Sequence, residues 1–190
     1  TQRLAGFFAL FGVLLCRAQT PSFEIPLSIP HDYSTDVTTN LQAVLDSTPD
    51  NARILFPELP YNPQTVGYRI EGTLTLAKRQ NLTIEGRGAH LRAFDPLDTN
   101  RFSATTVRTR SQWRISGSTN ITLLDLTVYG AHTNAGKDGT YDETREAQTA
   151  YDITGGSVSV RVERCKAFQT FGDGIYIGGN SRHVSILHCH

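Results

Sequence analysis

Two aspartates, Asp152 and Asp173, are the residues of this sequence best suited to acid–base chemistry. Asp152 lies in the alternating segment YDITG, and Asp173 lies between two glycines, two residues before a similar segment begins at Ile175. A carboxyl group at such a position can transfer a proton or hold a cation. Asp173 could instead cap its turn by accepting backbone N–H groups, as aspartate often does beside glycine.

Side chains that could bind a substrate recur at one position of a short motif. An aromatic or aliphatic residue followed by x-Ile-x-Gly begins at Tyr68, Trp113, Tyr151 and Ile175. Residues that flank an inward-facing isoleucine in a strand point outward. The motif therefore predicts one exposed column, formed by Arg69, Arg114, Asp152 and Tyr176. Arginine can hold a sugar carboxylate through two parallel hydrogen bonds, and tyrosine offers a flat ring and a hydroxyl group. An ordinary solvated face is the alternative for this column.

A 24-residue repeat predicts how the column is built. The residues Ile153, Val160, Val162 and Cys165 return as Ile177, Val184, Ile186 and Cys189. Repeats of this length are typical of solenoids, in which equivalent residues stack about 4.8 Å apart. The motif isoleucines Ile70, Ile115, Ile153 and Ile177 are 45, 38 and 24 residues apart, and the surplus is assigned to loops near residues 93–112 and 130–149. A degenerate extra turn within the 45-residue interval is the alternative.

The stacking has consequences for two pairs of residues. Strand spacing would put Asp152 and Asp173 on the order of 11 Å apart, too far for a direct nucleophile and acid pair. Cys165 and Cys189 are predicted to be stacked free thiols, with a disulfide between them as the alternative.

Mostly strands are expected to carry these residues. Residues 19–35, rich in proline and polar residues, predict an extended leader. The segment TNLQAVLDSTP predicts a short amphipathic helix with Thr39 as N-cap, Gln42 three residues on and Pro49 as a stop. From Arg53 onward, short β-branched segments with a period of two, such as RILFP and NLTIEG, predict strands. The expected fold class is all-β.

Residues 36–190 resemble the right-handed parallel β-helix proteins of the pectate-lyase-like (pectin lyase-like) superfamily, of the secreted bacterial type. The segments TTNLQAVLD, ARILFPELPY, YRIEGTLTL and NLTIEGRGAHL are similar to the superfamily's opening, and FGDGIYIGGNSRHVSI is similar to its later coils. The resemblance implies a right-handed parallel β-helix, a solenoid with a short N-terminal capping α-helix. It also implies a carbohydrate-active lyase, glycoside hydrolase or epimerase.

One motif departs from that superfamily. Polygalacturonase-like hydrolases carry Gly-Asp-Asp where this sequence has Gly172, Asp173 and Gly174, and Thr149 and Ala150 stand where a further aspartate is expected. The departure puts the paired-carboxylate mechanism of those hydrolases in doubt.

The insert between residues 130 and 149 could add carboxylates beside Asp152. It contains Asp138, Asp142, Glu143 and Glu146, and we expect Glu146 to join the substrate-binding residues. A calcium-bridged site would need several such groups, so no resident cofactor is expected, with Ca²⁺ as the alternative. Lys137 and Arg145 partly neutralise these acids, and a solvated surface loop is the alternative for the insert.

Composition excludes some partners and suggests a location. The 18 basic and 18 acidic side chains cancel, which gives no sequence-wide attraction to nucleic acid or membrane. Residues 1–18 contain the apolar run LAGFFALFGVLL, which predicts a secretory signal peptide and is too short to span a bilayer as a helix. A buried N-terminal helix is the alternative. The sequence also has no methionine and stops inside a strand-like pattern, so we interpret it as a fragment truncated at its C-terminus.

Together these patterns predict a secreted, extracellular protein that binds an extended acidic polysaccharide and cleaves or modifies it. Arg114 and Asp152 are the first candidates for binding and proton transfer. The alternative is a non-catalytic surface or structural β-helix, or a glycan-binding module, which the missing second aspartate favours. Substrate, reaction type and oligomeric state stay open.

Overall fold

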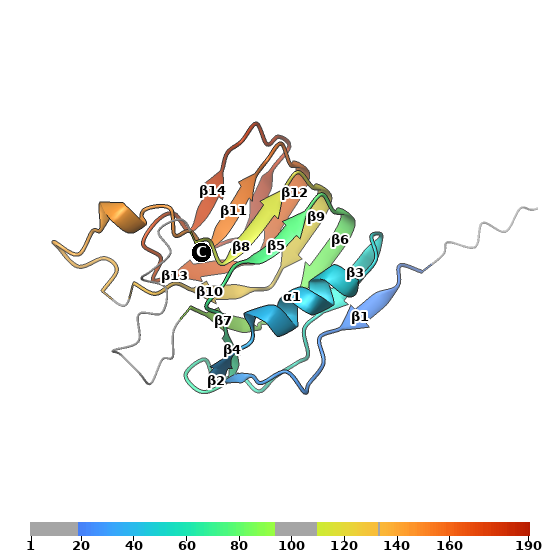
Figure 1. Cartoon of the computed structure of the whole chain (residues 1–190), viewed down its shortest axis with the longest axis horizontal. Helices are drawn as coiled ribbons and strands as arrows, with labels where there is room; N and C mark the ends of the chain where they lie inside the picture. The colour runs from blue at the N-terminus through green and yellow to red at the C-terminus, as the bar shows by residue number, and fades with distance from the viewer. Residues whose placement is uncertain (1–18, 94–109, 133) are drawn as a thin grey trace, which may run out of the picture.

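Parallel strands make up most of the computed structural model, which describes residues 19–93, 110–132 and 134–190 (Figure 1). The strands form three sheets, and every pairing within them is parallel. Within the described residues there is one α-helix, α1 (Thr38–Ser47), and one short 3₁₀ helix, η2 (Glu143–Arg145). The strand content confirms the predicted all-β class. The predicted signal peptide lies outside the described residues.

The three sheets are named A, B and C. Sheet A contains β1 (Ser22–Glu24), β3 (Ala52–Leu55), β6 (Gln80–Glu85), β9 (Thr119–Leu124), β12 (Val158–Glu163) and β15 (Ser185–Leu187). Sheet B contains β2 (Asp32–Asp36), β4 (Gly67–Arg69), β7 (His90–Arg92), β10 (Thr127–Tyr129) and β13 (Lys166–Phe168). Sheet C contains β5 (Leu74–Ala77), β8 (Trp113–Ser116), β11 (Tyr151–Thr154) and β14 (Ile175–Ile177).

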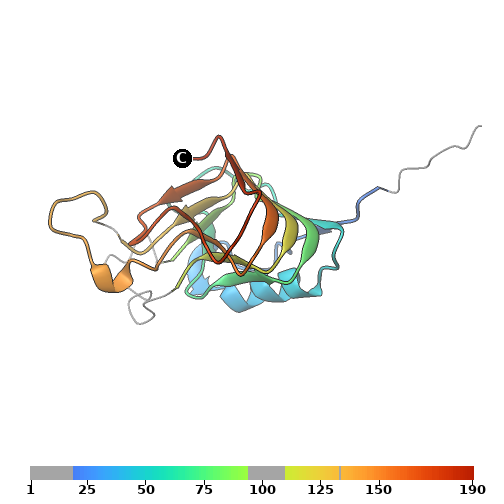
Figure 2. The ribbon, with the colours of Figure 1, turned by 90° about the horizontal axis from the view of Figure 1, so that it is seen from above.

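From β3 onward the chain visits sheets A, B and C in a constant order, and each circuit adds one strand to each sheet (Figures 1 and 2). The corners are short: two residues join β8 to β9, and two join β9 to β10. Two of the connections from sheet B to sheet C are much longer, with residues 93–112 before β8 and residues 130–150 before β11. Part of the leader predicted at residues 19–35 belongs to this arrangement, because it contributes β1 to sheet A and most of β2 to sheet B.

Strand register confirms the stacking that the 24-residue repeat predicts. Ile153 pairs with Ile177 between β11 and β14, and Val162 pairs with Ile186 between β12 and β15. Ile153 and Val162 are completely buried, because each sits between the inward residues of two neighbouring strands. Cys165 is a free thiol in the same core, as is Cys189, and burial is the main cause that raises the pKa of Cys165 to about 11.

The predicted stacking of Ile70 on Ile115 is wrong. Ile115 pairs instead with Leu76 of β5, 39 residues earlier. β4 belongs to sheet B, and the chain crosses to sheet C through the short turn at residues 70–73. The 45-residue interval therefore compares positions in two different sheets, and Arg69 lies outside the column that contains Arg114.

Helix α1 stands where a strand of sheet C would come in the first circuit, between β2 and β3. Its Leu41 and Leu45 are buried in the core. The Gln42 amide donates to the Thr75 carbonyl at 2.9 Å and accepts from the Thr75 N–H at 2.7 Å, which satisfies the free edge of β5. The predicted N-cap at Thr39 is wrong. The N-cap is Val37, two residues earlier, and the helix begins at Thr38, where Asp36 accepts hydrogen bonds from the Thr38 backbone and from the Glu71 N–H.

A column of left-handed residues marks the corner at which the chain enters sheet A. Its members have φ between 53° and 63° and occupy equivalent positions at or just before the start of successive strands: Asn51, Asn81, Asn120, Ser159 and His183. Asn120 donates to Asn81 at 2.8 Å, and Asn81 donates to Asn51 at 2.7 Å. Asparagine tolerates this backbone conformation better than most residues. The three stacked asparagines, called the asparagine ladder, therefore suit the left-handed corner and also hydrogen-bond to one another.

Ser159→Asn is expected to stabilise the protein by about 0.5–1 kcal/mol, because it adds one amide to the ladder in a conformation that suits asparagine. Urea unfolding monitored by circular dichroism measures the change. Ser159→Ala is the control, since it removes the hydroxyl group without adding an amide. Equal stability of the two variants would show that the ladder does not extend to this position.

Candidate functional site

A pocket of about 660 Å³ lies on the outer face of sheet C and includes most of the predicted site residues. Three of its residues belong to the sheet, and the others come from the turn before β14 and from the connection before β11. The lining residues are Arg114, Asp152, Tyr176, Asp173, Thr149, Ala147, Glu146, Thr144 and Glu143.

The sheet supplies one column of side chains to this pocket. Strand register aligns Arg114 with Asp152 and Asp152 with Tyr176, as predicted, and Thr75 takes the place predicted for Arg69. These positions alternate with buried Ile115 and Ile153 in their strands, so their side chains project away from the core.

Arg114 and Asp152 form an ion pair at the base of the column. Arg114 Nε donates to Asp152 Oδ2 at 2.9 Å, and the Asp152 side chain is 13% exposed. The other oxygen, Asp152 Oδ1, is buried and has no hydrogen-bond partner among the described residues. The ion pair thus fixes the orientation of the carboxylate, whose side chain keeps its small exposed area toward the pocket.

Asp173 reaches the pocket from an exposed turn that pairs with the neighbouring segment. Its carbonyl accepts from the Ala150 N–H at 3.2 Å, and the Gly174 carbonyl accepts from Tyr151 at 3.1 Å. No described residue donates a hydrogen bond to its carboxylate, so the predicted turn cap is not seen in this part of the chain. The carboxylate is available to a ligand.

The connection before β11 brings further acids to the pocket, and a close backbone contact holds it there. A side chain at Gly172 would place its Cβ 1.7 Å from the Glu146 carbonyl oxygen, so only glycine fits beside the loop. Arg145 lies over the Phe171 ring, 4.9 Å from its centroid, and its Nε is 3.2 Å from Asp142 Oδ2. Arg145 is thereby directed away from the pocket, which retains the carboxylates of Glu143 and Glu146.

The pocket is acidic. It has four carboxylates and one guanidinium group, a formal charge of −3, and the guanidinium is already paired with Asp152. The charge would repel an anionic sugar and would suit a neutral or cationic one. Within the described part of the chain, no group of three or more His, Cys, Asp or Glu side chains is placed to hold a metal ion.

Arg69 does not contribute to this site. Its side chain is 7% exposed on sheet B and forms an ion pair with Glu71. It is absent from the lining residues, and the expectation that it belongs to an exposed column is wrong. By contrast, Arg114, Asp152, Asp173, Tyr176 and Glu146 are brought together as the sequence suggests.

Comparison with known proteins gives little direct guidance. No protein-family model matches the sequence, and no curated protein does. A solved structure of a candidate glycosyl hydrolase from Parabacteroides merdae ATCC 43184 is similar over 89% of this chain and 95% of that chain, with 14% identity and a TM-score of 0.34. No helix among the described residues is long and apolar enough to cross a membrane.

Proposed function

We propose that this protein is a secreted right-handed parallel β-helix that binds a glycan in the sheet C pocket and hydrolyses a glycosidic bond. The constant order of sheets A, B and C supports the solenoid, since each circuit buries its inward face against the next. The right-handed sense follows from the strong preference for right-handed crossovers between parallel strands.

The observation that carries the proposed reaction is that Asp152 and Asp173 line one pocket from adjacent strands. Asp173 is level with Thr149, three residues before Asp152, because Ile175 pairs with Tyr151. Strand geometry puts the two Cα atoms about 11 Å apart. Inverting glycosidases hold their two carboxyl groups roughly 6.5–9.5 Å apart, which leaves room for a water molecule. Side chains from Cα atoms at this distance are long enough to reach such a separation.

The two carboxylates suit different roles. Asp152, held against Arg114, would act as the base that takes a proton from water while the water oxygen attacks the anomeric carbon. Asp173, exposed and without an ion pair among the described residues, would give a proton to the departing oxygen. Tyr176, 47% exposed, would contact a sugar ring, and Glu146 would accept hydrogen bonds from sugar hydroxyl groups.

The pocket's charge favours a neutral or amino-sugar glycan over the acidic polysaccharide expected from the sequence. Elimination by a lyase needs the substrate carboxylate to be neutralised, yet the one guanidinium group lining this pocket is paired with Asp152. Hydrolysis therefore fits better than elimination, and no resident metal is required for the proposed steps.

A panel of neutral, amino-sugar and acidic polysaccharides tests the proposal. We expect new reducing ends from a neutral or amino-sugar substrate, no unsaturated ends, and inverted anomeric configuration in the first product seen by NMR. Retained configuration would contradict the assigned pair, and unsaturated products would contradict hydrolysis. Binding without any product would favour the non-catalytic glycan-binding alternative.

A further inference from the structure

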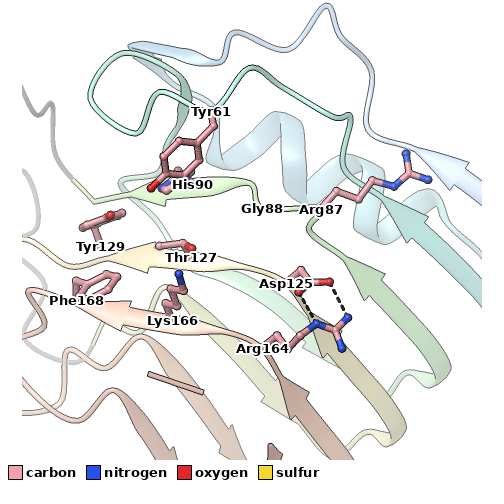
Figure 3. Close-up of a pocket in the computed structure, with 10 residues that line it drawn as sticks. All are labelled: Tyr61, Arg87, Gly88, His90, Asp125, Thr127, Tyr129, Arg164, Lys166 and Phe168. Atoms are coloured by element: carbon pink, nitrogen blue, oxygen red, sulfur yellow. Dashed lines mark hydrogen bonds and ion pairs between the residues drawn. The ribbon is translucent and has the colours of Figure 1, made fainter. Parts of the chain in front are cut away.

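A second pocket, of about 450 Å³, lies on the outer face of sheet B, away from the column of sheet C (Figure 3). Outward residues of three adjacent strands form its floor, and corner residues form its rim. The floor contains His90 of β7, Thr127 and Tyr129 of β10, and Lys166 and Phe168 of β13. Figure 3 shows the aromatic side chains at one end and the charged corner residues at the other.

The aromatic end is rigid. Tyr129 lies between its two register neighbours, with the Arg92 guanidinium 3.7 Å from its ring centroid and the Phe168 ring 5.2 Å away. Both faces of Tyr129 are therefore occupied, and it presents its edge and hydroxyl group outward. Tyr61, 84% exposed, lies over His90 with ring centroids 5.7 Å apart and keeps a free face for a ligand.

The loop that carries Tyr61 is tied to sheet B. Tyr33 donates to the Val66 carbonyl at 2.9 Å and to the Pro63 carbonyl at 3.2 Å, and Arg92 donates to the same Pro63 carbonyl at 2.7 Å. Tyr61 also borders a smaller cavity of about 100 Å³ on its other side. The aromatic platform is thus held in place before any ligand binds.

The opposite end is cationic. Arg164 donates to both oxygens of Asp125, at 2.8 and 2.9 Å. Arg87 is 3.9 Å from its nearest carboxylate oxygens, and Lys166 forms no ion pair with any described residue. The pocket therefore has three cations and one carboxylate, in contrast to the acidic pocket on sheet C.

His90 adds a hydrogen-bonding group without adding charge. It is 8% exposed, and its Nδ1 has no hydrogen-bond partner among the described residues. Burial, and then the charges of Arg92 and Lys166, lower its pKa to about 4, so the ring is neutral near pH 7. A buried, unpartnered nitrogen beneath Tyr61 is a polar group that a ligand could satisfy.

We propose that this pocket binds an acidic sugar of a glycan chain. The carboxylate or sulfate group would lie at Lys166, with Arg87 adding positive charge at the rim, and the apolar face of the sugar ring would contact Tyr61. Thr127 and the Tyr129 hydroxyl group would bind sugar hydroxyls. This site goes beyond the proposed hydrolysis, because it lies on another sheet and binds an acidic sugar, whereas the sheet C pocket binds a neutral or amino sugar. It rests on the proposed function only in assuming that the ligand is a glycan.

An acidic sugar fits the pocket better than a nucleic acid strand. Single-stranded nucleic acids bind through successive bases stacked on free aromatic faces along a basic groove. Here both faces of Tyr129 are covered, so Tyr61 alone among the lining residues offers a largely exposed ring. The sequence as a whole is neutral, whereas nucleic-acid-binding domains are strongly basic.

Isothermal titration with a sulfated oligosaccharide and with oligogalacturonate, each compared with a neutral oligosaccharide of equal length, tests this site. Asp173→Asn is used as the background, because the expected loss of kcat slows cleavage during the titration. We expect the acidic ligands to bind in the sheet B pocket, whereas the neutral one binds in the sheet C pocket, so that only the acidic affinities depend on residues of sheet B. The double variant R87Q and K166Q should lose about tenfold or more in affinity, as should Tyr61→Ala.

Lys137→Gln is the matched control, because this exposed lysine lies outside both pockets, and its affinity should stay within twofold. Equal affinity of the double variant and the control for the acidic ligands would overturn the proposal, as would an equal loss of affinity for the neutral ligand in the double variant. Tighter binding of an oligothymidylate would assign the site to nucleic acid instead. If the protein hydrolyses no glycan, the affinities measured for the sheet B pocket would still be as expected. The experiment therefore tests the binding site independently of the proposed hydrolysis.

Discussion

Asp173→Asn is expected to lower kcat for the proposed hydrolysis by about 10²–10⁴-fold, because the variant cannot give a proton to the departing sugar oxygen. KM should change little, since Asp173 lies on an exposed turn at the side of the pocket and Arg114, Asp152 and Tyr176 are retained. Initial rates on the active polysaccharide measure the loss. An aryl glycoside with an acidic phenol should recover most of it, because that leaving group departs without protonation.

Asp152→Asn separates the two roles. Removal of the base should slow the polysaccharide and the aryl glycoside to a similar extent, because water must be activated in both reactions. Asp138→Asn is the control, since Asp138 belongs to the same connection as Glu143 but does not line the pocket. Wild-type kcat in Asp173→Asn, with an unchanged melting temperature, would show that Asp173 has no part in proton transfer.

Trp113→Ala is expected to lower the free energy of unfolding by about 3–5 kcal/mol. Trp113 is fully buried in β8 and pairs with Leu74 on one side and Tyr151 on the other, so its removal opens a cavity shared by three circuits. Guanidinium unfolding followed by circular dichroism measures the loss. Fluorescence cannot serve here, because Trp113 is the one tryptophan of the sequence.

Trp113→Phe provides the comparison. It retains an aromatic ring and deletes the indole N–H, which has no hydrogen-bond partner among the described residues. We expect it to lose less than half as much stability as the alanine variant. The phenylalanine leaves a smaller cavity, and part of its cost is recovered because the unsatisfied indole N–H is removed. A loss below about 1 kcal/mol for Trp113→Ala would mean that the three circuits do not share one packed core.

Register between neighbouring strands could be predicted from the sequence wherever two circuits have the same length. Ile153 and Ile177 are an example, because no insertion intervenes and the pattern repeats without a shift. The prediction from the motif copy that begins at Tyr68 was wrong, because buried and exposed residues alternate in the same way in the strands of all three sheets. Nothing near Arg69 indicates locally that β4 belongs to sheet B and β5 to sheet C.

The start of helix α1 could not be predicted for a related reason. Thr39 and Gln42 match a capping pattern, yet Asp36 binds both Thr38 and the N–H of Glu71, which is 35 residues away. Gln42 is engaged with Thr75 rather than with the helix terminus. Contacts with a later part of the chain decide the role of these side chains.

The acidic pocket was largely predictable, whereas the basic pocket was not. Arg114, Asp152 and Tyr176 share one motif position, and parallel register aligns them. His90, Thr127 and Lys166 also share one register position, but their spacings of 37 and 39 residues and their unlike chemistry hide the relation. The alternation of buried and exposed residues predicts that each of these three side chains points outward, but it does not predict that they lie side by side in the sheet.

The connections between sheets have a consequence for engineering. The corners from β8 to β9 and from β11 to β12 are only two and three residues long, while the stretch from β10 to β11 spans residues 130–150 and carries Glu143 and Glu146. Grafting a foreign sequence into that stretch would change ligand preference and leave the corner geometry intact. Directed evolution of this scaffold should therefore confine insertions and randomisation to that one segment.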